Sequence, residues 1–272
     1  MYALLLQIRN LLSAYYVLFA SMAFLLKNGA AFLHVPKTGG TWIKRVLQEL
    51  DLIEAHLGHS HNDWDRSFWH DKMHADLKVA KYLIRRAVRS PRAQARINPD
   101  CFKFCFIREP LHWYESYWRF MQGLEWNWKN WGDERDPYKW HPCAMVNTLG
   151  SPDFNTFMHN VNKKRPGFVT EMYGWYVRPG IGFVGRQERL EKDLMTAFAL
   201  MNLDVDAARV AKVARINESP SDIPVPEWDP ALRKATLQLE YAGYVRFGYP
   251  IVGALMDSSL KNGRKAGRLQ SA

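Results

Sequence analysis

The sequence predicts an α/β domain of three layers, in which a central, mainly parallel sheet is flanked by helices. Short apolar runs that are typical of buried strands occur at 31–35, 101–107 and 181–185. Each run is followed by a segment with helical spacing of its apolar residues, and strands alternating with helices are typical of parallel sheets. The chain of 272 residues is 47% hydrophobic and 24% charged, which excludes a largely disordered protein.

Helices are expected where apolar residues recur every three or four positions. The predicted helices cover 41–52, 71–89, a stretch that begins near 110, 189–201, 206–213 and 229–243. Two segments show neither strand nor helix periodicity. Residues 51–69 are polar and His-rich and are expected to form a loop, and 124–149 is expected to be a long ordered insertion.

The chain begins with an apolar segment, residues 3–26, which is expected to form a hydrophobic helix within 1–29. Its most continuous part, 11–26, is shorter than the roughly 20 residues that span a bilayer. Three interpretations stay open: a helix packed on the domain or lying on a membrane surface, a membrane anchor, and a signal peptide. The last is the least favoured, because cleavage would leave the first strand barely supported. The folded domain is expected to cover 30–255, followed by a basic flexible tail, 256–272.

The net charge of +10 favours an anionic partner, such as a phosphate-bearing ligand, a membrane surface or nucleic acid, without choosing among them. Six of the cations fall within 81–96, either on a solvated helix face or on a rim that attracts an acidic acceptor. The three cysteines lack a disulfide-framework spacing, so a reducing compartment is expected; they are Cys101, Cys105 and Cys143.

The segment HVPKTGGTW, residues 34–42, is typical of a phosphate-binding loop between a strand and a helix. Gly39 and Gly40 let backbone N–H groups close around an anion, and the helix N-terminus adds unsatisfied donors and partial positive charge. Lys37 supplies a full charge, and Thr41 is placed to cap the helix and to donate to a phosphate oxygen. The alternative is an ordinary strand-to-helix turn with Thr41 as N-cap. Because Lys37 precedes the glycines, the loop is not a Walker A loop, and ATP or GTP hydrolysis is disfavoured.

The run PKTGGTW resembles the 5′-phosphosulfate loop of sulfotransferases that use 3′-phosphoadenosine 5′-phosphosulfate (PAPS). A second run, R-x-P-x5-S from Arg108 to Ser116, resembles the signature with which that family binds the 3′-phosphate. An arginine fork suits a phosphate, and a proline suits the start of the helix that holds the serine. The resemblance spans about 30–250, with weaker similarities at 183–194, 216–219 and 247–250.

This resemblance implies a P-loop-like fold, PAPS as the sulfuryl donor and no required metal. It implies that Trp42 stacks on the adenine; the alternative is that Trp42 is an apolar core residue. The donor-binding residues that it implies are Lys37, Thr38, Gly39, Gly40, Thr41, Trp42, Arg108 and Ser116.

Two catalytic roles follow from the resemblance. Lys37 would stabilise the charge that develops on the leaving phosphate. The run GHSH at 58–61 resembles the G-H-x-H loop of the glycan 2-O-sulfotransferase branch, which implies His59 as general base with His61 as helper or alternate. A carboxylate base such as Glu54 stays open, as does a His-rich loop that is only solvated or binds adventitious metal.

We therefore expect a sulfotransferase that transfers the sulfuryl group of PAPS in line to an acceptor hydroxyl. A carbohydrate acceptor is favoured by the G-H-x-H resemblance and by tryptophans within 113–140 that are suited to stacking on sugars. No nucleic-acid partner is expected. A P-loop nucleotide kinase or phosphotransferase and a non-catalytic protein that binds anionic glycans are the alternatives. The expected location is cytoplasmic, with membrane contact through 3–26 left open, or the Golgi membrane if the source is eukaryotic.

Overall fold

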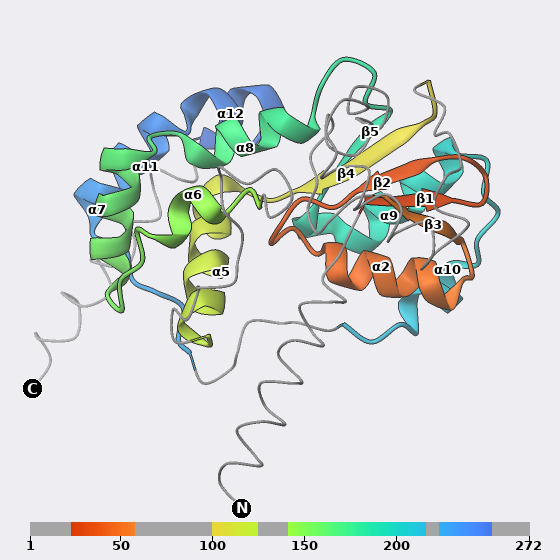
Figure 1. Cartoon of the computed structure of the whole chain (residues 1–272), viewed down its shortest axis with the longest axis horizontal. Helices are drawn as coiled ribbons and strands as arrows, with labels where there is room; N and C mark the ends of the chain where they lie inside the picture. Colours follow the sequence, from red (N-terminus) through yellow and green to blue (C-terminus); the bar gives the residue numbers. More distant parts are fainter. Residues whose placement is uncertain (1–22, 58–99, 125–140, 216–222, 252–272) are drawn as a thin grey trace, which may run out of the picture.

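The sheet of this protein has five strands and is mixed (Figure 1). In the computed structural model, residues 23–57, 100–124, 141–215 and 223–251 are described. The strands lie in the order β3-β1-β2-β4-β5. Strands β2, β4 and β5 are parallel, whereas β1 is antiparallel to both of its neighbours, which confirms the predicted α/β class with mainly parallel central strands. The strands are β1 (Ala23–Leu26), β2 (Ala31–Leu33), β3 (Ile53–Leu57), β4 (Lys103–Ile107) and β5 (Phe183–Arg186).

The helices of the described ranges agree in part with the predicted ones. They are α2 (Gly40–Glu49), α5 (Pro110–Gln122), α6 (Ala144–Asn147), α7 (Phe154–Lys164), α8 (Phe168–Tyr176), the 3₁₀ helix η3 (Gln187–Arg189), α9 (Leu190–Leu200), α10 (Ala207–Ala211), α11 (Pro230–Leu239) and α12 (Tyr241–Phe247). The predictions that correspond to α2, α5, α9 and α10 are confirmed. No prediction covered α7 and α8. The predicted helix 71–89 and most of the insertion 124–149 lie outside the described residues.

The predicted single helix 229–243 is instead two helices that meet at Glu240. The side chain of Glu240 is fully buried and accepts hydrogen bonds from the backbone N–H groups of Val169 (3.0 Å) and Thr170 (2.8 Å) at the start of α8. It also accepts a hydrogen bond from the hydroxyl of Tyr114 in α5 (2.6 Å). The carboxylate thereby joins three helices, a tertiary arrangement that the spacing of apolar residues does not report.

Each face of the sheet is closed by its own apolar cluster, because successive strand residues point to opposite faces. On one face, Phe104 and Phe106 of β4 pack with residues of α2 and α9. On the other face, Cys105 and Ile107 pack with residues of α5, α7 and α8. Figure 1 shows α2 beside the sheet and the group α5, α6, α7, α8, α11 and α12 gathered at one end of the molecule.

Two predictions near the N-terminus are wrong. Residues 23–26 are not the end of a hydrophobic helix within 1–29 but the buried strand β1, which turns at Gly29 (φ 84°) and pairs with β2. A continuous apolar run has no periodicity by which strand and helix can be told apart. Residues 53–57 are not a loop but the strand β3, which lies at the edge of the sheet and pairs with β1.

The remainder of the N-terminal apolar segment and the predicted tail 256–272 lie outside the described residues. Within the ranges that the structure describes, every helix is too short or too polar to cross a bilayer.

Candidate functional site

The candidate site lies where the three parallel strands end. In open α/β sheets, ligands bind beyond the carboxyl ends of the strands. Strand β2 leads into the loop that holds Lys37, β4 leads into Arg108, and β5 leads into Gln187 and Glu188. The structure thus brings the two predicted phosphate motifs to one edge of the sheet, although they are far apart in the sequence.

Two hydrogen bonds hold the loop between β2 and α2. The Thr38 hydroxyl donates to the carbonyl oxygen of Val35 (2.9 Å), and the Trp113 indole N–H of α5 donates to the carbonyl oxygen of Pro36 (2.8 Å). Thr38 is buried and its side chain is used inside the loop, so its backbone N–H is the group that would reach a ligand. Lys37 has a left-handed backbone (φ 65°), a strained conformation for a residue with a side chain.

Both glycines of the loop are required by close approaches. Gly39 has a φ of 84°, and a Cβ atom on it would lie 2.7 Å from Cδ2 of Leu190 in α9. A Cβ atom on Gly40 would lie 2.1 Å from Cδ2 of His34. Because His34 is only 3% exposed and stacks on Phe32 (5.9 Å between ring centroids), its imidazole has little room to yield.

We expect Gly40→Ala to destabilise the protein by about 1–3 kcal/mol, because the added methyl group overpacks the contact with His34. The free energy of unfolding from denaturant titration measures this effect. Gly174→Ala is the matched control, since a Cβ at Gly174 inside α8 would meet nothing closer than Arg246 Nη1 at 3.7 Å. The control should be neutral or slightly stabilising. Equal stability of the Gly40→Ala variant and the wild type would contradict the close approach.

The N-terminus of α2 is left open to a ligand. The residue that caps it is Gly39, which has no side chain with which to accept a hydrogen bond from the first turn. The expectation that Thr41 caps the helix, which belonged to both interpretations of the loop, is therefore wrong: Thr41 lies inside the helix and is half-buried. A helix N-terminus presents backbone N–H groups without intrahelical partners and a partial positive charge. Together with the glycines and Lys37, it forms a cradle for an anion.

Lys37 lies in a strongly positive surrounding. The pKa of Lys37 is lowered to about 7, mainly by burial and also by the nearby charges of Arg108 and Arg119, while the Cys143 thiol acts in the opposite direction. The ammonium Nζ lies 4.0 Å from the centroid of the Phe120 ring. The ligand-free amine is therefore poised to lose its proton near neutral pH, and an anion bound beside it would favour the charged form.

Arg108 is held at the end of β4 through its backbone. Its N–H donates to the Tyr173 hydroxyl (3.1 Å), which in turn donates to the Arg108 carbonyl oxygen (2.7 Å). Burial lowers the pKa of Arg108, an effect opposed by Tyr173 and by Glu188, Glu115 and Glu109. Its buried Nε has no hydrogen-bond partner within the described ranges. A buried donor without a partner costs stability, so it is a group that a phosphate would satisfy.

Ser116 lies on α5, eight positions after Arg108, and is buried. The helix begins with Pro110 and is capped by Glu109, whose carboxylate accepts the His112 N–H (2.7 Å). Since Trp113 and Phe120 follow the spacing of three and four residues from Ser116, all three lie on one face of α5, and that face meets the Lys37 loop. The sequence analysis did not single out Arg119 and Phe120. They lie three and four residues after Ser116, a spacing that indicates the same helix face as Ser116.

The side chains of Trp42 and Arg186 both donate hydrogen bonds to backbone carbonyl groups elsewhere in the fold. Trp42 is 4% exposed, packs in the cluster between the sheet, α2 and α9, and donates its indole N–H to the Val213 carbonyl (3.0 Å). The Arg215 guanidinium lies 5.7 Å from its ring. Arg186 donates to the carbonyl oxygens of Phe247 (2.6 Å) and Gly248 at the end of α12.

Of the three candidate bases, the structure describes only Glu54. His59 and His61 lie outside the described residues. The alternative base, Glu54, is exposed on the edge strand β3. Within the part of the chain that the structure describes, no group of three or more His, Cys, Asp or Glu side chains is arranged to hold a metal ion.

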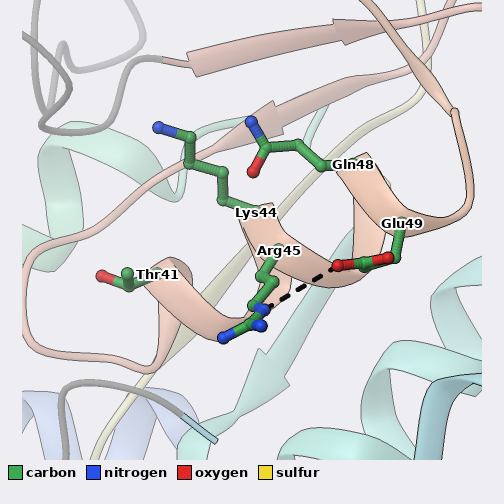
Figure 2. Close-up of a pocket in the computed structure, with 5 residues that line it drawn as sticks. All are labelled: Thr41, Lys44, Arg45, Gln48 and Glu49. Atoms are coloured by element: carbon green, nitrogen blue, oxygen red, sulfur yellow. Dashed lines mark ion pairs between the residues drawn. The ribbon is translucent and has the colours of Figure 1, made fainter. Parts of the chain in front are cut away.

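A shallow pocket of about 460 Å³ runs along α2 from the cradle. Figure 2 shows its lining side chains, which all come from this helix, and the ion pair between Arg45 and Glu49 (4.0 Å). Burial lowers the pKa of Lys44. The pocket is lined by Thr41, Lys44, Arg45, Gln48 and Glu49, so its wall carries two cations and one carboxylate.

Comparison with known proteins gives one match. The model of the sulfotransferase family matches residues 25–250, which run from within β1 to three residues beyond the end of α12 and include both phosphate motifs. No curated protein and no solved structure matches the chain.

Proposed function

Because the chain belongs to the sulfotransferase family, we propose that it transfers the sulfuryl group of PAPS to a hydroxyl of a carbohydrate acceptor. The observation that supports PAPS best is the pair of anion sites at one edge of the sheet. One consists of Lys37 and the N-terminus of α2, and the other is the buried Nε of Arg108, which has no hydrogen-bond partner among the described residues. PAPS has two such anionic groups, a 5′-phosphosulfate and a 3′-phosphate.

The chemistry divides between the donor and the chain. When bound, PAPS supplies a sulfuryl group on a phosphosulfate anhydride and leaves as adenosine 3′,5′-bisphosphate. The backbone N–H groups at the start of α2 would bind the 5′-phosphate oxygens, and the Lys37 ammonium would stabilise the negative charge on the leaving phosphate. Arg108 and Ser116 would hold the 3′-phosphate through charge-assisted hydrogen bonds. Among the described residues, the groups proposed to bind the donor are thus two cationic side chains, backbone N–H groups and the Ser116 hydroxyl.

We further propose that His59 removes the proton of the acceptor hydroxyl, with His61 as the alternate. Their support is the resemblance of GHSH to the G-H-x-H loop. The carbohydrate acceptor rests on that resemblance too, and the hydroxyl, amide and charged side chains that line the pocket along α2 would suit a polar acceptor beside the cradle.

We expect His59→Ala to leave donor binding unchanged and to lower kcat by about 10²–10⁴-fold, the usual contribution of a general base. Calorimetric binding of adenosine 3′,5′-bisphosphate and initial rates of ³⁵S transfer measure the two effects. His159→Ala, an exposed histidine on α7, is the matched control. Near-normal turnover of the His59→Ala variant would move the base to His61 or Glu54.

The donor is tested by calorimetric titration with adenosine 3′,5′-bisphosphate and, separately, with ATP and Mg²⁺. Binding of the bisphosphate alone supports a PAPS-dependent enzyme, and binding of ATP instead would support a nucleotide kinase. Binding of neither would favour a non-catalytic glycan-binding protein. Incubation with ³⁵S-labelled PAPS and a panel of polysaccharides, lipid-linked sugars and small alcohols then identifies the acceptor class.

A further inference from the structure

Helix α5 contacts the Lys37 loop at two points. The indole N–H of Trp113 donates to the Pro36 carbonyl (2.8 Å), and the ring of Phe120 lies under the Lys37 ammonium, with 4.0 Å between Nζ and the ring centroid. Ser116 lies between them on the same helix face. The helix that carries the candidate 3′-phosphate serine therefore also supports the lysine of the other anion site.

The contact with Phe120 is attractive because the face of an aromatic ring has negative electrostatic potential. The other groups that act on the Lys37 charge are Arg108 at the end of β4, Arg119 on α5, and the Cys143 thiol before α6. The two arginines repel the ammonium, and burial removes much of its hydration. A cation–π contact gains strength under such desolvation.

We propose that Phe120 is a positioning residue whose ring holds the charged Lys37 side chain at the anion cradle, before and after the donor binds. The catalytic meaning of this inference rests on the proposed function. The contact between Phe120 and Lys37 does not depend on that function. The ring supports the ammonium from the side of α5, the helix that also holds the Lys37 loop through Trp113. The contact thereby favours the protonated form of Lys37 and opposes the effect of burial and of the two arginines.

The test compares Phe120→Leu, which keeps an apolar side chain, with Phe120→Tyr, which keeps the aromatic ring. The pKa of Lys37 is measured in the ligand-free protein by NMR of ¹³Cε-labelled lysines, with Lys37→Arg to assign the signal. We expect Phe120→Leu to lower this pKa by about 0.5–1.5 pH units and Phe120→Tyr to keep it near the wild-type value. Phe154→Leu, which removes a buried ring from α7, controls for loss of core packing. An unchanged Lys37 pKa in Phe120→Leu would overturn the inference.

Donor binding gives a second readout. Near pH 5.5 Lys37 is mostly protonated in the wild type and at least half protonated in Phe120→Leu, so the two proteins should bind adenosine 3′,5′-bisphosphate with affinities within about twofold of each other. At pH 8 the variant should bind about 3–30-fold more weakly, because binding must then restore a proton that the ring no longer helps to hold. A purely structural role would weaken binding equally at both pH values, and that result would also overturn the inference. Absence of binding by the wild type at any pH would refute the proposed function, while the Lys37 pKa would still decide the role of Phe120.

Discussion

Replacement of Lys37 by alanine is expected to lower kcat for sulfuryl transfer by about 10²–10³-fold, the usual cost of removing one preorganised group that stabilises charge in the transition state. The reason lies in its surroundings. Lys37 is brought to the open N-terminus of α2 by a loop whose strained backbone and two hydrogen bonds define its direction. Initial rates of ³⁵S transfer from PAPS, with the acceptor found by the panel, measure the effect.

The same change should not destabilise the fold. The Lys37 charge is buried beside Arg108 and Arg119, which repel it, so its removal should leave Tm unchanged or slightly raise it. Lys164→Ala is the control, because Lys164 is an exposed cation in the last turn of α7 and belongs to neither the loop nor the pocket along α2. Similar kcat losses in both variants would show that general positive charge, and not the place of Lys37, is what matters.

The second large effect is expected for Arg108→Ala, which should weaken binding of adenosine 3′,5′-bisphosphate by about 10–150-fold. A hydrogen bond to a charged group contributes about 1.5–3 kcal/mol, and the buried Nε of Arg108 is a donor without a partner within the described ranges. Calorimetric titration of wild type and variant gives the two dissociation constants. Ser116→Ala should have a smaller effect in the same direction, because a neutral donor contributes less.

A second ligand distinguishes a direct contact of Arg108 with the 3′-phosphate from a structural role of Arg108 at the sheet edge. Adenosine 5′-monophosphate lacks the 3′-phosphate, so its affinity should be nearly the same for wild type and Arg108→Ala. This comparison isolates one contact in the way that a double-mutant cycle does. Equal losses for both nucleotides would instead mean that the Arg108 side chain supports the sheet edge, since the backbone hydrogen bonds with Tyr173 are kept in the alanine variant.

The sequence alone determined those features whose cause is local. The alternation of apolar strands and amphipathic helices predicted β2, β4, β5 and the helices that follow them. The period of the apolar residues and the length of each element depend only on residues that are neighbours in the sequence. The loop with Lys37, Gly39 and Gly40 was predicted for the same reason, since its glycines and its place between a strand and a helix are visible in one short run. Arg108 and Ser116 followed from a single spacing.

Only the tertiary structure decided features that depend on partners distant in the chain. Ala23–Leu26 is a strand because β2 and β3 pair with its two edges, and an apolar run alone does not report that pairing. The tertiary fold also turned the Thr38 hydroxyl inward, left Thr41 inside α2 and packed Trp42 into the core. It placed Phe120 of α5 under the ammonium of Lys37. Contacts between segments far apart in sequence arise from how the sheet and helices pack, so the charge state of the lysine is a property of the fold and not of the motif.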